Sequence, residues 1–115
     1  MGFERNVLAN KADIVVKKIY KSTLKYAQIH QFSIGEQLRR ASLSIVLNIV
    51  ESGGRKNPKE KINLLNISFG SLKETQYLLD FALFQKLITQ KEYDEIFPLM
   101  EELARILYSI IYRKN

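Results

Sequence analysis

Residues 33–54 read SIGEQLRRASLSIVLNIVESGG, and this stretch decides the fold class. Its apolar residues recur at every third or fourth position, which is the spacing of one face of an α-helix. Ser33 and Glu36 have the spacing of a capping box, which predicts that the helix begins there. The Gly-Gly pair predicts its end, because glycine tolerates the left-handed conformation that closes many helices. We therefore expect a helix over residues 33–52.

The same periodicity predicts three more helices, over residues of about 7–27, 58–86 and 90–113, and no strand. Asn57 and Pro58 form a typical helix start, and Thr89 with Glu92 repeats the capping-box pattern. Pro98 predicts a kink in the last helix, or a later start of its regular part. Short loops favour antiparallel neighbours. The chain therefore predicts one all-α domain over residues 1–115, an antiparallel up-down-up-down four-helix bundle.

The helix over residues 33–52 has more apolar surface than one bundle needs. One face would fill the interior; it consists of Leu38, Ala41, Ile45 and Ile49. A second face has no use in an isolated bundle; it consists of Leu43, Val46, Leu47 and Val50. A helix that is apolar nearly all round is buried nearly all round. This face predicts a cyclic homo-oligomer, unless it packs under the long third helix and leaves little exposed.

The composition limits the classes of function. The chain has 115 residues, no cysteine and one histidine, which argues against disulfides, thiolate chemistry and most zinc sites. The beginning of the chain lacks the features of a signal peptide, and no apolar run is long enough to span a bilayer. We expect a cytoplasmic protein without a membrane partner.

The net charge of +6 is unevenly distributed. The first 56 residues carry ten Lys and Arg against four Asp and Glu, whereas the rest of the chain carries eight of each. A basic half favours an anionic partner, although many small domains are basic without one. The candidate ligands for nucleic-acid phosphates are Lys11, Lys17, Lys18, Lys21, Lys25, Arg39, Arg40, Arg55 and Lys56.

Three of these lysines, Lys11, Lys18 and Lys25, are seven residues apart and share one helical stripe, with Lys21 beside them. Binding through such a surface depends on counterion release and reads charge or shape rather than sequence. The alternative is a solvated lysine face that keeps the protein soluble.

Four polar residues interrupt or face the apolar helix: Arg39, Asn48, Glu51 and Glu74. We interpret them as a structural hydrogen-bond network, because a buried carboxylate needs such partners. The alternative is that Glu51 and Glu74 hold a metal ion or act as an acid–base pair.

An enzyme is the contrasting hypothesis. Five acids in the last helix are closely spaced, as in some helical nucleotide pyrophosphatases: Glu92, Asp94, Glu95, Glu101 and Glu102. No second acid cluster clearly faces them, and His30 alone cannot form a two-histidine metal site. We therefore predict no catalytic residues, no metal site and no cofactor. After nucleic-acid binding, the second hypothesis is a scaffold for an acidic protein partner, and the third is a metal-dependent nucleotide phosphohydrolase.

Three segments carry a more specific pattern: residues 37–45, QLRRASLSI; residues 48–56, NIVESGGRK; and residues 70–74, GSLKE. The pattern resembles that of the four-helix-bundle proteins called 23S rRNA intervening-sequence proteins. The resemblance covers nearly the full length. Two positions depart from the family pattern: Ser52 stands where glycine usually follows the acid, and Pro98 interrupts a helix that is normally continuous.

The resemblance implies a homopentamer around a central channel. It also implies kinship with the accessory proteins of diversity-generating retroelements, basic barrels that bind nucleic acid and a reverse transcriptase. Nucleic acid and a protein such as a reverse transcriptase are therefore the expected partners, beside other copies of the chain. The family name describes the location of the genes more than an activity, so the process remains open.

Overall fold

The computed structural model describes residues 3–113, with side chains from Val7 onward. It contains helices α1 (Phe3–Thr23), α2 (Gln28–His30), α3 (Glu36–Gly53), α4 (Pro58–Phe84) and α5 (Gln90–Ile111), and a π-helical turn, η1 (Gln31–Gly35), that joins α2 to α3. No strand occurs in the described part of the chain, which is therefore all-α. No helix in it is long and apolar enough to cross a membrane.

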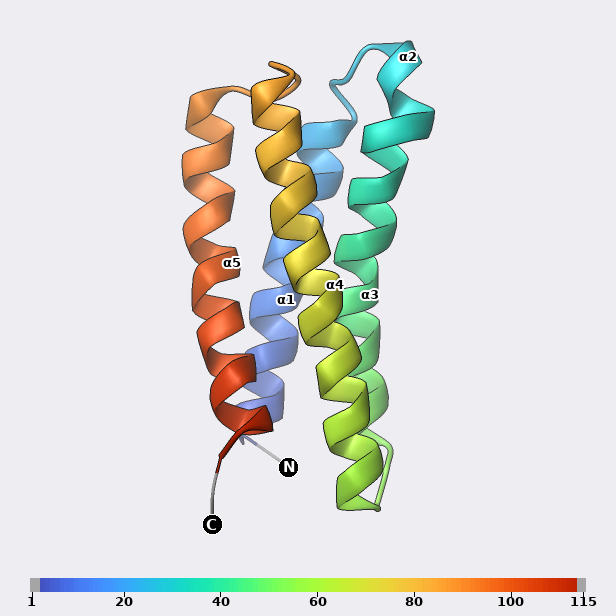
Figure 1. Ribbon diagram of the computed structural model, residues 1–115, viewed down its shortest axis with the longest axis vertical. Coiled ribbons are helices and arrows are strands. Elements are labelled where there is room, and N and C mark those ends of the chain that lie inside the picture. Colours follow the sequence, from blue (N-terminus) through green and yellow to red (C-terminus); the bar gives the residue numbers. More distant parts are fainter. Residues whose placement is uncertain (1–2, 114–115) are drawn as a thin grey trace.

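The four long helices lie side by side along a molecule that measures 46 × 23 × 18 Å (Figure 1). Helix α1 packs against α3 and α5, and α4 packs against the same two helices, so α1 and α4 lie diagonally opposite. The α1–α2 and α4–α5 connections lie at one end of the molecule, and the α3–α4 connection lies at the other (Figure 1). The arrangement is that of a four-helix bundle.

The core contains the apolar stripes that the helical periodicity predicts. In α3 the expected inner face is buried in full: Leu38, Ala41, Ile45 and Ile49. The α1 stripe is buried as well: Leu8, Ala12, Val15, Val16 and Ile19. Met100 of α5 is also fully buried, and Tyr20 of α1 is 37% exposed. Burial of each large side chain stabilises the fold by roughly 1.5–3 kcal/mol.

Helices α3 and α4 meet along a seam of hydroxyl groups. The Ser68 hydroxyl donates a hydrogen bond to the carbonyl oxygen of Ile45 at 2.8 Å, and Ser44 and Ser71 share a hydrogen bond of 2.8 Å. Small side chains at such positions let two helices approach closely, and buried hydroxyls need these partners. The seam fixes the register of α3 against α4.

The start of the second long helix differs from the expectation. Helical backbone begins at Gln28, and Ser33 lies inside η1, where its hydroxyl donates to the His30 carbonyl at 3.4 Å instead of capping a helix. Gln31 and Arg39 hold this segment. The Gln31 amide donates to the carbonyls of Thr23 and Tyr26 at 2.8 and 2.9 Å, and Arg39 donates to the Gln31 carbonyl at 3.0 Å. These contacts keep the α1–α2 connection against α3.

Several helix ends also differ from the predictions, in mechanism or in position. Helix α3 ends at Gly53 as expected, but Gly54 has a φ of −88° and is not left-handed. Lys86, just after α4, does adopt the left-handed conformation, with a φ of 61°. Helix α1 ends at Thr23, earlier than predicted. Helix α5 runs without a break from Gln90 through Pro98, so Pro98 does not mark the start of its regular part.

Candidate nucleic-acid interface

The predicted lysine stripe of α1 lies beside an acidic face of α5. Lys11 forms an ion pair of 3.0 Å with Glu102, and Lys25 forms one of 3.0 Å with Glu92. Lys17 pairs within its own helix, with Asp13 at 2.8 Å. Sequence spacing places these lysines on one helix but says nothing of the neighbouring helix. Part of the expected positive charge is therefore neutralised across the bundle.

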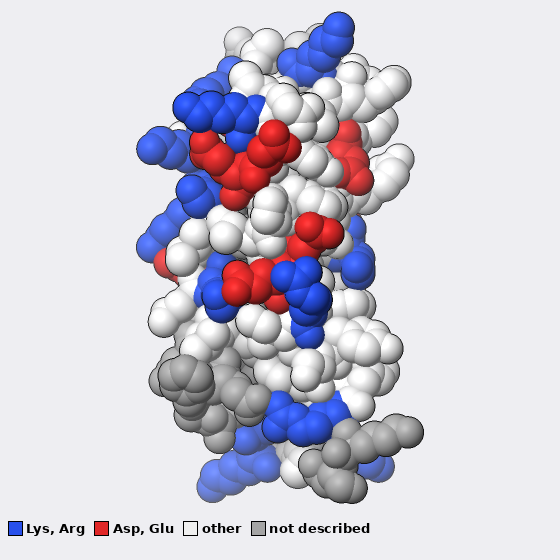
Figure 2. Space-filling view, turned by 90° about the vertical axis from the view of Figure 1, so that its left-hand side faces the viewer, with Lys and Arg blue, Asp and Glu red and all other residues white. Residues whose placement is uncertain are grey.

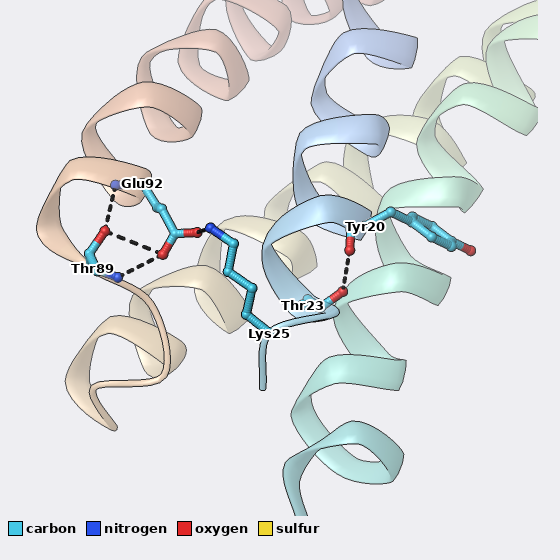
Figure 3. Close-up of polar contacts among 5 residues, drawn as sticks. All are labelled: Tyr20, Thr23, Lys25, Thr89 and Glu92. Carbon is cyan, nitrogen blue, oxygen red and sulfur yellow. Dashed lines mark hydrogen bonds and ion pairs between the residues drawn. The ribbon is translucent and has the colours of Figure 1, made fainter. Parts of the chain in front are cut away.

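Glu92 links the Lys25 ion pair to the start of α5 (Figure 3). Its carboxylate accepts hydrogen bonds from the Thr89 backbone N–H at 3.0 Å and from the Lys25 ammonium, while the Thr89 hydroxyl accepts from the Glu92 N–H at 3.1 Å. Burial pushes the pKa of Glu92 up, but the hydrogen bonds from Thr89 and Lys25 outweigh it, so the pKa lies below its usual value. The predicted capping box is therefore confirmed.

Two predicted lysines keep an unpaired charge. Lys18 is half-buried and Lys21 is exposed, and neither forms an ion pair within the described part of the chain. Lys91 of α5 lies on the same surface as these two. Sequence reasoning missed Lys91 because only the packing of α5 against α1 brings it there. Figure 2 shows basic side chains gathered along one edge of this face, beside a group of acidic ones.

The second predicted basic cluster is split. Arg39 is half-buried, and its guanidinium is engaged by the side chain and backbone of Gln31 at 3.2 and 3.0 Å. Arg55 pairs with Glu51 at 3.2 Å. Arg40 and Lys56 are exposed. Arg39 thus has a structural role in this conformation, whereas Arg40 and Lys56 are exposed cations with no ion pair to another described residue.

The four residues interpreted as one polar network are not joined to one another. Asn48 donates to the Ser44 carbonyl and hydroxyl at 2.8 and 3.2 Å, as an extension of the hydroxyl seam. Arg39 is bonded to Gln31, as above, and Glu51 to Arg55. Glu74 is exposed on α4. The predicted buried carboxylates are at the surface of the protomer, so they require no compensating network there.

The second apolar face of α3 is open to solvent in the single chain. The side chains of Leu43, Leu47 and Val50 are 37%, 54% and 59% exposed. Val46 is partly buried and packs against the core. The alternative was that this face packs under the long third predicted helix, which is α4. Helix α4 does not cover the face, so that alternative holds for Val46 alone.

The acids of α5 are distributed among separate contacts. Glu92 belongs to the capping box, Asp94 accepts from the Gln90 amide at 2.9 Å, and Glu102 pairs with Lys11. Among the residues that the structure describes, no group of three or more His, Cys, Asp or Glu side chains is placed to share a metal ion. This arrangement offers no support for a metal-dependent phosphohydrolase.

Comparison with known proteins agrees with this architecture. A crystal structure of a protein of unknown function from the S23 ribosomal protein family of Bacteroides thetaiotaomicron matches with a TM-score of 0.87 and 27% sequence identity, over 95% of this chain and 98% of that one. No curated protein matches the chain significantly. The family model described as 23S rRNA-intervening sequence protein matches residues 4–109. The chain therefore belongs to the 23S rRNA-intervening sequence protein family.

Proposed function

We propose that this protein is a non-enzymatic accessory protein that binds RNA or DNA through a basic surface, with little sequence specificity. In this proposal, cytoplasmic up-down-up-down bundles with antiparallel neighbours assemble into a cyclic homo-oligomer, with five copies as the expected number. The observation that carries the proposal is the set of cations of Lys18, Lys21 and Lys91. They share one surface and take part in no ion pair with another described residue.

Electrostatics supports nucleic acid as the ligand. Three unpaired ammonium groups on one surface attract phosphates and release the counterions condensed on them. The net charge of +6 makes the long-range field of the whole chain attractive to polyanions. Repetition of the same surface around a ring would add these fields. No arrangement for reading base edges is needed for binding of this kind.

The exposed face of α3 supports the oligomer. Leu43, Leu47 and Val50 lie in one stripe, and a second copy would remove their side chains from water. Full burial of each is worth roughly 1.5–3 kcal/mol. In a closed ring every copy has this face covered by a neighbour. In a dimer held by one head-to-tail contact, one copy would leave its face exposed to water.

The test is fluorescence anisotropy with labelled structured RNA and labelled duplex DNA, at about 50 to 300 mM salt. We expect binding that weakens steeply as salt rises. The double substitution Lys18→Glu and Lys21→Glu should weaken binding at low salt by about tenfold or more, because each reversal replaces an attraction to phosphate by a repulsion. Lys11 and Lys25 are less suitable, since reversal there also breaks ion pairs with α5.

Lys73→Glu is the matched control. Lys73 is exposed on α4, diagonally opposite α1, so its reversal changes the net charge by the same amount per residue without touching the proposed surface. It should weaken binding much less than Lys18→Glu or Lys21→Glu does when each is made alone. If neither RNA nor DNA binds at low salt, the proposal is wrong.

A scaffold for an acidic protein partner is the second candidate. The observation that favours it is a set of exposed apolar side chains near the α1–α2 connection: Leu24, Ile29 and Phe32. Such side chains are typical of protein contacts rather than phosphate contacts. This candidate predicts that Phe32→Ser leaves RNA affinity unchanged and weakens capture of a purified acidic partner protein.

A further inference from the structure

A surface pocket lies between the C-terminal part of α1 and the first turns of α5. Its volume is about 430 Å³, and four lysines line it: Lys18 and Lys21 from α1, Lys25 from the α1–α2 connection and Lys91 from α5. Two carboxylates, Glu92 and Glu95, line it as well. Figure 3 shows the Lys25 side chain reaching from the α1–α2 connection to Glu92 at the beginning of α5. The pocket therefore combines cations from two helices that are far apart in the sequence.

Ser22 lines this pocket and is only 5% exposed. Its hydroxyl oxygen is buried and has no hydrogen-bond partner. Buried hydroxyls in proteins are nearly always hydrogen-bonded, because an unsatisfied one costs free energy. Ser22 thus places an unsatisfied hydroxyl in the wall of the lysine-lined pocket, where a rotation of its side chain would let it donate to an acceptor bound there.

The charge of the pocket is positive after the internal contacts are subtracted. The carboxylate of Glu92 is already satisfied by Lys25 and by the capping box. Lys18, Lys21 and Lys91 remain, opposed by Glu95 alone. The N-terminus of α5 adds partial positive charge at the same place, and the C-terminus of α1 offsets part of it. The balance favours a doubly charged oxyanion.

We infer that this pocket binds a phosphate group. A phosphate offers several acceptor oxygens, which match the three unpaired ammonium groups and the Ser22 hydroxyl. We infer further that this phosphate is the terminal phosphate of a nucleic acid, and this part of the inference rests on the proposed function. The same chemistry is offered by a free phosphate or pyrophosphate, and the experiment separates the two sources.

The first arm is an NMR titration of the intact, isotope-labelled protein with sodium pyrophosphate, against sodium chloride at matched ionic strength. We expect saturable shifts of the amide signals of residues 18–25 and 89–96. Lys91→Gln should weaken pyrophosphate binding by about fivefold. Lys59→Gln should not, although Lys59 is also an exposed lysine at the second position of a helix with a side-chain N-cap.

Ser22→Ala provides a readout that a general electrostatic effect would not move. It should weaken pyrophosphate binding while leaving the stability of the free protein unchanged or higher, because it removes an unsatisfied buried hydroxyl. Shifts that do not saturate, or an equal loss in the Lys59→Gln and Lys91→Gln variants, would overturn the inference.

The second arm measures the affinity of a single-stranded RNA with and without a 5′-phosphate. Tighter binding of the phosphorylated RNA, lost in Lys91→Gln, identifies a nucleic-acid end as the source. Equal affinity of the two RNAs, together with saturable pyrophosphate binding, identifies a small phosphate ligand. RNA binding that is insensitive to Lys91→Gln, with no saturable pyrophosphate binding, sinks the pocket inference and leaves the proposed function standing. Saturable pyrophosphate binding without any RNA binding supports the phosphate pocket and contradicts the proposed function.

Discussion

At the scale of single residues, Tyr26 is the most unusual side chain of the core. It lies in the α1–α2 connection with its ring buried, and its hydroxyl has no hydrogen-bond partner in the described part of the chain. Burial, reinforced by the negative charge of Glu92 and opposed by Arg39, raises its pKa to about 12. The folded state therefore holds the Tyr26 proton more tightly than the unfolded chain, whose phenol titrates at about 10. The stability that Tyr26 contributes is present below pH 10 and is lost as the pH rises toward 12.

We predict that Tyr26→Phe reduces this alkaline loss and leaves the free energy of unfolding at about pH 7 unchanged or raised by about 1 kcal/mol, because no hydrogen bond is removed. Urea denaturation at about pH 7 and about pH 11 would measure both effects. Tyr93→Phe is the matched control. Tyr93 also has a pKa of about 12, through burial and its hydrogen bond to Asp80. That hydroxyl donates to Asp80 at 2.6 Å, so its removal should destabilise the fold at neutral pH. An equal loss in both variants would contradict the account of Tyr26.

At the scale of helices, the end of α4 is closed by a lysine in a conformation that favours glycine. Lys86 has a φ of 61°. Its N–H donates to the Leu83 carbonyl at 2.9 Å and the N–H of Leu87 donates to the Ala82 carbonyl at 2.9 Å. These two bonds form a Schellman motif. The left-handed conformation costs an L-residue roughly 1 kcal/mol, so this helix end is strained.

Lys86→Gly should therefore raise the free energy of unfolding by about 0.5–1 kcal/mol, since glycine adopts positive φ without strain. Lys86→Ala separates this effect from loss of the lysine side chain, because alanine keeps the strain. It should leave stability near the wild-type value or below it. Thermal and urea denaturation of the three proteins measure the difference. A destabilised Lys86→Gly variant would mean that the Lys86 side chain, not its backbone, matters at this position.

The helix ends also show which parts of the structure local sequence can predict. The starts of α4 and α5 follow from Asn57 and Thr89, whose side chains cap residues two or three positions away. The end of α1 and the π-helical turn could not be predicted in this way. They depend on Gln31 bridging to Thr23 and on Arg39 bridging to Gln31, contacts eight residues apart.

The candidate site was predictable to a smaller extent, for the same reason. Spacing alone identified Lys18 and Lys21 on α1, and the structure leaves both unpaired. It could not show that Lys11 and Lys25 face acids more than sixty residues further along the chain. Spacing also could not show that Lys91 of α5 lies on the same surface as Lys18 and Lys21. Charge balance between packed helices is a tertiary property.

At the scale of the whole molecule, the exposed stripe of α3 predicts how copies associate. Leu47→Glu combined with Val50→Glu would place two carboxylates on that stripe, and burying unpaired charges at an interface costs several kcal/mol. We expect a variant that keeps its helical circular dichroism but elutes as a monomer, with a dissociation constant weaker by about 100-fold or more. Size-exclusion chromatography with light scattering measures the mass.

Leu24→Glu is the control for this prediction. Leu24 is 71% exposed, more than either interface residue, but it lies at the α1–α2 connection and not on α3. It should retain the mass of the unmodified protein. An unmodified protein that is itself monomeric at high concentration would refute the oligomer, and an unchanged mass of the double variant would assign the contact to another face.

The placement of the loops has a practical consequence for handling the protein. Helix α1 begins and α5 ends at the same end of the bundle, whereas the α1–α2 and α4–α5 connections, next to the lysine pocket, lie at the other (Figure 1). A purification tag or biotin on either terminus is thus separated from the pocket by most of the 46 Å length of the molecule. On a biosensor surface, attachment through either terminus would therefore leave the pocket at the end of the bundle that lies further from the surface.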